Sequence, residues 1–309
     1  MSRLVVLGSV NADHVLRVSS FPRPGETLHG RDYAVIAGGK GANQAVAAVR
    51  CGADVAFIAS VGDDAFGQQI RQSYAQEGMD VSAMKVQPDT PTGIAMIQVT
   101  DQGENSIALS AEANAALTAE AMVSDLDAID QADYLLMQLE TPMCGIEKAA
   151  FHAKASETKV VLNPAPAAAL SDKLLAAVDI ITPNETEAQS LTGIAVTDTA
   201  SAQAASNVLH QKGIETVLIT LGKQGVWLSE KAQKEGRLIP GFVVDAVDTT
   251  AAGDTFNGAL VTGLIEGQAL YQAIRFAHAA AALSVTQRGA QTSIPSRADV
   301  DAFLAKQHD

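Results

Sequence analysis

Along most of this chain, short apolar runs alternate with longer stretches in which apolar residues recur at helical spacing. Short β-rich runs occur at positions 3–7, 55–60, 134–138, 159–163, 180–182 and 216–220. Stretches with helical periodicity occupy positions 45–50, 65–77, 144–155, 184–191, 199–212 and 269–285. Strands that alternate with helices are typical of a mostly parallel sheet covered by helices on both faces. The pattern therefore predicts an α/β fold with three layers.

Two segments, near positions 13–36 and 92–109, break this alternation. In the second, β-forming runs at 93–100 and 105–109 flank a turn sequence, which is typical of a hairpin. We expect such antiparallel strands to form a small separate sheet, which beside a ligand site would act as a lid. The exposed edges of that lid favour contacts between two copies of the chain. Because no Pro-rich or Ser-rich linker interrupts the chain, the sequence predicts one domain over residues 1–309.

The stretch at 243–258 has the pattern of a strand end, a tight turn and a helix start. Residues 243–247 alternate apolar and polar as in a strand, and a helically periodic run follows Asp254. Between them, Ala251, Ala252 and Gly253 are small enough to let an anion approach the backbone, where the unpaired N–H groups of the new helix would attract it. Asp254 beside this anion hole suits a general base that accepts a proton from an alcohol during phosphoryl transfer.

The same residues also fit a purely structural hypothesis. Acids are common in the first turn of helices, where they cap free N–H groups, and small residues suit many tight turns. This stretch alone therefore leaves two interpretations of Asp254, a catalytic base and a helix cap.

The composition narrows the class of ligand. The 309 residues include 35 acidic and 21 basic side chains, a formal net charge of −14, whereas nucleic-acid surfaces present clustered Lys and Arg. We expect no nucleic-acid partner, and we expect a bound polyphosphate to be held by helix N-termini and cations. Cys51 and Cys144 lie far apart and favour a reducing compartment. Since neither a signal peptide nor a membrane-spanning run is evident, the sequence predicts a cytoplasmic protein without a membrane partner.

Two motifs at opposite ends of the chain carry a family resemblance. Residues 38–43, Gly-Gly-Lys-Gly-Ala-Asn, and residues 248–254, Asp-Thr-Thr-Ala-Ala-Gly-Asp, resemble the two signatures of the ribokinase family of carbohydrate kinases. Further matching pieces follow in the expected order at 11–13, 184–187, 220–225 and 288–293. Ala251 departs from the family pattern, in which Gly is more usual. The resemblance spans the whole chain and implies a ribokinase-like fold with a small β-sheet lid.

The resemblance also implies where a sugar would bind. Amide and carboxylate groups suit this task because each can pair with neighbouring hydroxyls. Ala95, Ile97 and Leu109 would present an apolar face of the lid to the sugar, although alternating apolar residues also suit a simple core. The implied sugar-binding residues are Asn11, Asp13, Gly39, Lys40, Asn43, Glu140 and Asp254.

For the nucleotide and ions, the resemblance implies sites in the C-terminal half. The implied ATP-binding residues are Asn184, Thr220, Gly222, Gly225, Gly253 and His278, with the anion hole at Ala251, Ala252 and Gly253. Glu187 would act on Mg²⁺ through water, because Mg²⁺ keeps much of its hydration. An activating potassium ion would bind mostly through backbone carbonyls, and hard oxygen ligands suit such an ion. The residues implied for it are Asp248, Thr250, Ser284, Gln287, Gly289 and Ser293.

Together these expectations describe an ATP-dependent sugar kinase. The resemblance implies phosphorylation of D-ribose at O5, giving D-ribose 5-phosphate and ADP, with Asp254 as base and a homodimer formed through the lid. Two alternatives remain open at this stage: a kinase for another small sugar or a nucleoside, and a sugar-binding regulatory module without catalysis, because a fold alone does not establish function.

Overall fold

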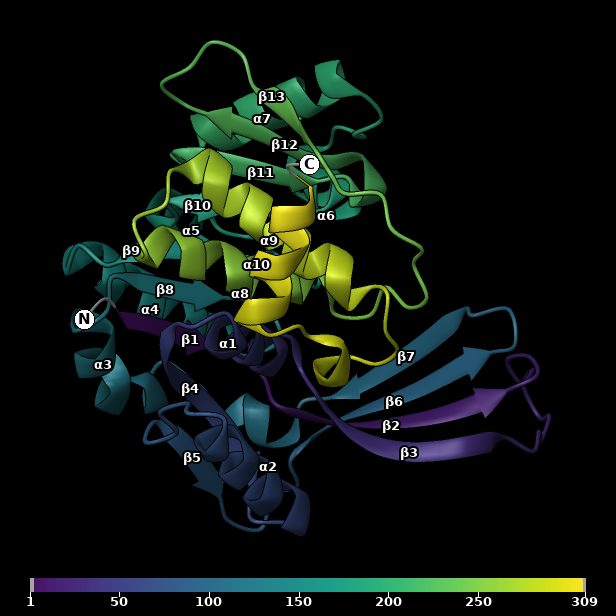
Figure 1. Ribbon diagram of the computed structural model, residues 1–309. Helices are drawn as coiled ribbons and strands as arrows, with labels where there is room; N and C mark the ends of the chain where they lie inside the picture. The colour runs from purple at the N-terminus through teal and green to yellow at the C-terminus, as the bar shows by residue number, and fades with distance from the viewer. Residues whose placement is uncertain (1–2, 308–309) are drawn as a thin grey trace.

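The computed structural model describes residues 3–307 and contains a large sheet and a small one (Figure 1). The large sheet has nine strands in the order β13-β12-β11-β10-β9-β8-β1-β4-β5. Seven of them pair in parallel, whereas β12 and β13 complete one edge as antiparallel strands. The strands are β1 (Arg3–Leu7), β4 (Asp54–Gly62), β5 (Met84–Gln87), β8 (Tyr134–Met137), β9 (Lys159–Leu162), β10 (Ile180–Ile181), β11 (Thr216–Thr220), β12 (Gly225–Glu230) and β13 (Arg237–Pro240).

Helices cover both faces of this sheet and enclose two apolar cores. One core is formed with α1 (Lys40–Arg50), α2 (Ala65–Gln76), α8 (Ala252–Ile265), α9 (Leu270–Ser284) and α10 (Arg297–Lys306). The other is formed with α3 (Leu126–Asp130), α4 (Met143–Ala155), α5 (Asp172–Ala177), α6 (Glu185–Thr192) and α7 (Thr199–Gln211). Short 3₁₀ turns lie at η1 (Glu112–Ala116), η2 (Ala121–Asp125), η3 (Gly222–Gln224) and η4 (Gln291–Ser293). The predicted three-layer α/β fold is confirmed.

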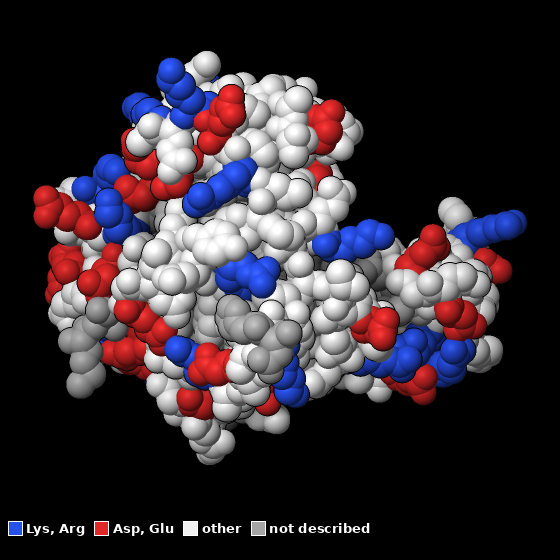
Figure 2. Space-filling view, turned by 45° about the horizontal axis from the view of Figure 1, so that its top comes forward, with Lys and Arg blue, Asp and Glu red and all other residues white. Residues whose placement is uncertain are grey.

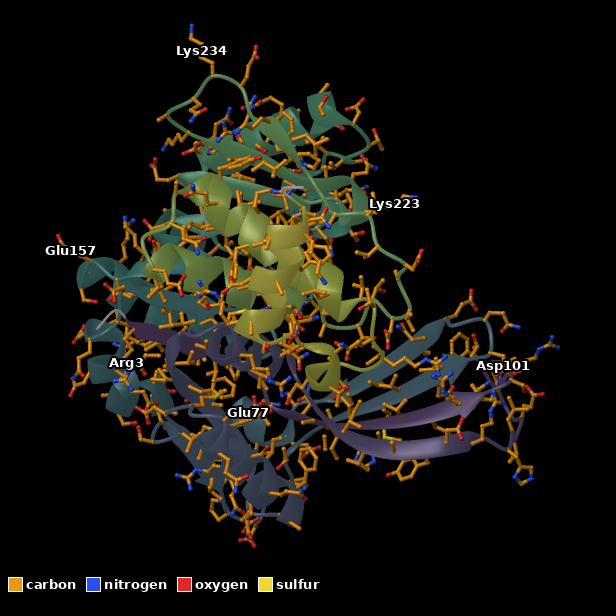
Figure 3. All side chains as sticks on the ribbon, in the orientation of Figure 1. Arg3, Glu77, Asp101, Glu157, Lys223 and Lys234 are labelled. Carbon is orange, nitrogen blue, oxygen red and sulfur yellow. The ribbon has the colours of Figure 1, made fainter. Side chains whose placement is uncertain are left out.

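The small sheet projects from the side of this body (Figure 1). It consists of β2 (Asn11–Val18), β3 (Arg31–Gly38), β6 (Gly93–Thr100) and β7 (Asn105–Ser110) in the order β3-β2-β6-β7. An ion pair of 2.6 Å between Arg31 and Asp101 joins its two hairpins, and Asp101 marks the end of the sheet farthest from the body (Figure 3). The strands arise from the two segments that break the alternation, and we refer to this sheet as the lid.

Most sequence-predicted elements coincide with observed ones, but the strand expected at 243–247 is wrong. These residues form an irregular segment in which Val243 is 99% exposed. Their alternation has no neighbouring strand to pair with among the described residues, and without ladder hydrogen bonds an alternating pattern does not form a strand. The helix expected at 45–50 begins earlier, at Lys40, after Gly39 with a φ of 93°.

The contact between α1 and α8 places the start of both helices on one side of the molecule. A Cβ atom at Gly258 would lie 2.4 Å from the carbonyl oxygen of Gln44 and 2.7 Å from the Cβ of Ala47, so only glycine allows this approach. The first turn of α8 consequently lies against the first turn of α1. This packing joins the two sequence motifs, which are about 200 positions apart.

Two further features concern the surface and the helices. Figure 2 shows acidic and basic side chains interspersed over the face that it displays. Within residues 3–307, none of the helices combines the length and the apolar character needed to cross a bilayer.

Candidate active site

Asp254 lies in the first turn of α8 but does not cap it. The cap position is Ala251, and no side chain in the described part of the chain caps the helix. The Asp254 carboxylate instead accepts hydrogen bonds from two amides of α1: Asn43 Nδ2 donates to Oδ2 and Gln44 Nε2 donates to Oδ1, both at 2.9 Å. The side chain is only 7% exposed. The cap interpretation is therefore wrong, and Asp254 is a buried carboxylate held by a distant part of the chain.

The start of α8 forms one wall of a cavity of about 350 Å³. Ala251 is left-handed, with φ 58° and ψ 14°, and this conformation turns the chain sharply into the helix. Ala252 N donates a long 3.3 Å bond back to Thr249 O. At Gly253 an added Cβ would meet nothing within 4 Å among the described residues, so the cavity reaches the backbone there. The uncapped first turn can thus present N–H groups to an anion.

Lys40 is the cation of this cavity, which Asp254 and Glu187 also line. Burial lowers the pKa of the Lys40 ammonium, but nearby carboxylates, led by Asp254 and Glu140, outweigh it and raise the pKa above its usual value. Burial raises the pKa of Glu187, while a hydrogen bond from the Asn184 backbone and the charge of Lys40 partly oppose this rise. A positive charge therefore stays at the point where four acids converge, namely Asp254, Glu140, Glu187 and Asp13.

A second cavity, of about 380 Å³, lies below the lid. Its lining includes Asn11, Glu140 and Leu109 of the lid strand β7. Glu140 Oε2 accepts hydrogen bonds from Ser9 Oγ at 2.6 Å and from Lys40 N at 2.9 Å. Asn11 Oδ1 accepts from Asn114 Nδ2 at 2.9 Å. These fixed amide and carboxylate groups beside an apolar lid suit a small polyhydroxylated ligand.

Asp13 lies at the base of the lid, two residues after Asn11 on β2. Burial, together with the negative charges of Glu140 and Asp254, raises its pKa to about 7, against the opposing effect of Lys40. Its carboxylate occupies the space beside Gly38, where any Cβ would come within 2.0 Å of Oδ2. Gly38 therefore leaves room for the Asp13 carboxylate, which belongs to the lining of neither cavity.

The residues expected to bind ATP are only partly brought together. Asn184, Thr220, Gly222 and Gly253 line the cavity at the start of α8, whereas Gly225 and His278 do not contribute to its lining. His278 is buried in α9, where its ring lies edge-on to Phe256 at 5.5 Å. Burial, with a smaller effect of Arg275, lowers the pKa of His278 to about 4, so the imidazole is neutral near pH 7. A neutral ring on an apolar helix face suits packing more than phosphate binding.

Glu187 and Asn184 form a reciprocal cap at the start of α6. Asn184 N donates to Glu187 Oε2 at 2.9 Å, and Glu187 N donates to Asn184 Oδ1 at 2.8 Å. The cap occupies one carboxylate oxygen of Glu187 and leaves the other for the cavity. A carboxylate with one committed oxygen can bind a hydrated Mg²⁺ through water, so the residues present fit this ion.

Asp248 connects the two segments expected to hold a monovalent cation. Its Oδ1 accepts from Thr250 N at 2.9 Å and from Thr250 Oγ1 at 2.6 Å, and its Oδ2 accepts from Gly289 N at 3.0 Å. These bonds lower the pKa of Asp248 against the effect of burial, so it is ionised. The hydroxyls of Ser284 and Ser293 donate to the carbonyls of Ala281 and Ala290. The donor set is oxygen-rich and suits a hard cation, but among the described residues no cluster of three or more His, Cys, Asp or Glu could hold a metal ion.

Sequence reasoning missed the buried amides behind Asp254. Gln44, Gln138 and Asn163 are at most 7% exposed and are joined by hydrogen bonds. Ser9 and Asn114, which orient Glu140 and Asn11, were missed as well. One usable signal for Gln44 is its place in an otherwise small and apolar stretch of α1, where an amide without a specific partner would be costly.

Comparison with known proteins places the chain in a family. The model of the pfkB family carbohydrate kinases matches residues 1–297. A ribokinase of Haemophilus influenzae is 56% identical over 97% of this chain and 98% of its own length. The structure of Arabidopsis thaliana ribokinase complexed with ribose and ATP superposes with a TM-score of 0.93 at 32% identity, covering 98% of this chain and 99% of that one. A Thermotoga maritima ribokinase gives a TM-score of 0.90 at 36% identity, covering 99% and 100%. The two motifs that meet at Asp254 are thus those of a known group of enzymes, and the chain belongs to the pfkB family of carbohydrate kinases.

Proposed function

We propose that this carbohydrate kinase transfers the γ-phosphoryl group of ATP to O5 of D-ribose, giving D-ribose 5-phosphate and ADP. The observation that carries the proposal is the position of Asp254, whose buried carboxylate lines the cavity at the open start of α8. A base and an anion-binding helix start then lie side by side, as phosphoryl transfer to an alcohol requires. The relatives that match along the whole chain are ribokinases, and one of them was solved with ribose and ATP.

In the mechanism we infer, ribose occupies the cavity below the lid. Asn11, Asp13 and Glu140 hold its hydroxyls, with Gly39, Lys40 and Asn43 around them. The 5-hydroxyl points towards Asp254, which accepts its proton as the bond to phosphorus forms. Because the usual pKa of an Asp is about 4, far below that of an alcohol, positioning contributes much of the effect.

ATP occupies the cavity at the start of α8, along Asn184, Thr220 and Gly222, whereas Gly225 and His278, which the family resemblance also assigns to ATP, lie outside its lining. The N–H groups of Ala252 and Gly253, following the turn at Ala251, stabilise the negative charge on the transferring group, and Lys40 adds a positive charge. Mg²⁺ bound through water at Glu187 would neutralise phosphate charge. Water is the competing nucleophile, so a lid that closes over the sugar limits ATP hydrolysis.

A potassium ion is the second cofactor that we propose. Asp248 and Thr250 lie on the segment before α8, and Ser284, Gln287, Gly289 and Ser293 lie on and after the end of α9. The bond from Gly289 N to Asp248 Oδ2 joins the two segments, and Thr250 N fixes the other carboxylate oxygen within its own segment. A cation between them would stabilise the turn at Ala251 by holding its carbonyls in place. It would then favour the geometry of the anion hole without entering the chemistry.

We further propose a cytoplasmic homodimer that associates through the lid. Cys51 and Cys144 are both unpaired, in keeping with a reducing compartment where ATP is present. The lid strands carry exposed apolar side chains, among them Tyr33, Met96 and Ile107. An exposed apolar sheet surface favours association.

An assay of ADP release tests the proposed function. Wild-type protein with ATP and Mg²⁺ should release ADP when D-ribose is added, and ³¹P NMR should identify ribose 5-phosphate; a panel of pentoses and nucleosides tests selectivity. Asp254→Asn should bind ribose nearly as well as wild type but lower kcat by about 10² to 10⁴, the range for a lost general base. Asp245→Asn, at an exposed acid shortly before α8, is the matched control and should keep wild-type kcat.

The outcomes separate the hypotheses. ADP release that does not depend on any sugar, or binding of ribose without turnover, would contradict the proposed activity. Normal turnover in Asp254→Asn would leave the kinase activity in place and remove Asp254 from the role of base.

A further inference from the structure

The Asp254 carboxylate is held from both sides by consecutive residues of α1. Asn43 Nδ2 donates a hydrogen bond to Oδ2 and Gln44 Nε2 donates one to Oδ1, each at 2.9 Å. Gln44 is 0% exposed, so its amide contacts no solvent and its hydrogen bonds come from the protein. Two hydrogen bonds donated by side-chain amides restrict both the position and the rotation of the carboxylate.

The direction of every amide in this network follows from the charge of Asp254. A carboxylate only accepts hydrogen bonds, so Gln44 must present its NH₂ group to Asp254, and the same Nε2 also donates to Asn163 Oδ1 at 3.0 Å. Gln44 Oε1 therefore points the other way and accepts from Gln138 Nε2 at 2.6 Å. Reversing the Gln44 amide would place two acceptors against each other, so only this orientation satisfies both ends of the Gln44 side chain, although Gln138 Oε1 has no hydrogen-bond partner among the described residues.

The network is anchored at the carboxyl edge of the large sheet. Gln138 directly follows β8, Asn163 directly follows β9, and Asn163 Nδ2 donates to the carbonyl of Thr182, the residue after β10. These three strands are neighbours in the sheet. Gly258 of α8 packs against the Gln44 backbone and keeps the residue in place. The side chain that touches Asp254 is thus supported by rigid elements on all sides.

We propose that Gln44 is a positioning residue for Asp254, which fixes the carboxylate through Oδ1 so that its remaining acceptor positions face the cavity where the sugar hydroxyl meets the phosphoryl group. This inference rests on the proposed function, since it assigns a task within that reaction. Gln44 touches neither substrate nor nucleotide in this scheme. It acts by keeping the base in an orientation that accepts a proton.

Replacing the amide with an acid distinguishes this task from simple core packing. In Gln44→Glu the shape is kept, but the side chain can donate to Asp254 only when it is protonated. At low pH the pair shares a proton, and the introduced carboxyl group imitates the amide. As the pH rises the pair loses that proton, and two carboxylates at hydrogen-bond distance repel each other. The variant therefore needs a proton that the wild type does not need.

The experiment measures kcat and KM for ribose and ATP from about pH 5 to about pH 9. Gln44→Leu should lower kcat by about 10- to 100-fold at every pH, with KM for ATP little changed, because a misplaced base loses rate more than binding. The ratio of Gln44→Glu kcat to wild-type kcat should fall at least about 10-fold as the pH rises. Gln87→Glu is the matched control, since Gln87 also donates from a partly buried amide, to Ser60 at 3.0 Å, but lies on the edge strand β5. Its kcat ratio should not change with pH.

Several results would overturn the role of Gln44. If Gln44→Leu and Gln44→Glu both turn over like wild type, or if the Gln44→Glu ratio is flat across the pH range, the amide does not position the base. Should Gln44→Leu fail to fold by circular dichroism, the pH profile of the isosteric Gln44→Glu still decides the question. An inactive wild-type protein would overturn both the proposed function and this role. An active wild type whose Gln44 variants keep the wild-type kcat at every pH would overturn only the role of Gln44.

Discussion

The acid most perturbed at the scale of single residues is Asp13, whose pKa is raised to about 7 by burial and by the charges of Glu140 and Asp254. Between about pH 4 and about pH 7 the folded protein keeps a proton that the unfolded chain has released, so its stability falls as the pH rises through this window. In ligand-free urea denaturation, Asp13→Asn should remove that loss. The free energy of unfolding of Asp13→Asn minus that of wild type should increase across the window by on the order of 2 to 4 kcal/mol.

Asp127→Asn, at an exposed acid of α3, is the control for this measurement. If the stability curves of Asp13→Asn and wild type run parallel from acid to neutral pH, Asp13 is ionised in the folded protein throughout, and the burial argument fails.

The sequence predicted those site residues that lie in a recognisable local motif. It missed those whose role depends on partners far away along the chain. Asp254 and Gly253 stand out because small residues, an acid and a helix start are adjacent. Gln44 has no such context, since its partners Gln138 and Asn163 follow strands that only the sheet order brings together. The same distance explains why Asp254 could not be separated from a helix cap before its partners on α1 were known.

At the scale of elements, the start of α8 allows a test of the anion hole that leaves the fold intact. An added Cβ at Gly253 would meet no described atom within 4 Å, and Ala is favoured over Gly in a helix by about 1 kcal/mol. Gly253→Ala should therefore keep or raise the free energy of unfolding. Its methyl group would occupy the space where a phosphate approaches the backbone, so we expect kcat to fall by about 10-fold or more and KM for ATP to rise. Unchanged kinetics in a stable variant would show that no phosphate reaches this backbone.

The prediction of elements succeeded for helices with several turns of periodic sequence. It failed for short strands, whose formation depends on pairing with a neighbouring strand. The helices at 199–212 and 269–285 were found within one residue of their ends, because several turns of a helix repeat the signal. The strand expected at 243–247 is absent, and the edge strands β5 and β13 and the neighbouring strand β12 were not predicted, because a few alternating residues form a strand only beside a partner.

At the scale of the whole molecule, the lid is the part that packs least against the two apolar cores. Within residues 3–307, neither core takes fully buried residues from β3 or β7, and from these two strands only the partly buried Ala37 packs against a core. The lid residues Met96 and Ile107 are 57% and 53% exposed, although they are large and apolar. The pairing of β6 with β7 places Ile107 opposite Ile97 and Met96 opposite Ala108, so the two exposed side chains lie on opposite faces of the sheet. A second copy of the chain that packs against both faces of the lid would bury these apolar side chains.

Charged substitutions on the lid test the proposed dimer. The double variant Met96→Glu with Ile107→Glu should raise the dissociation constant of the dimer by about 100-fold or more, because both carboxylates would be buried without partners. Sedimentation equilibrium should show a wild-type dimer and a monomeric variant. Val123→Glu is the matched control, since Val123 is 61% exposed but lies on η2, away from the lid. A monomeric wild type at micromolar concentration would contradict the dimer, and a lid variant that remains as tightly associated as Val123→Glu would place the contact elsewhere on the molecule.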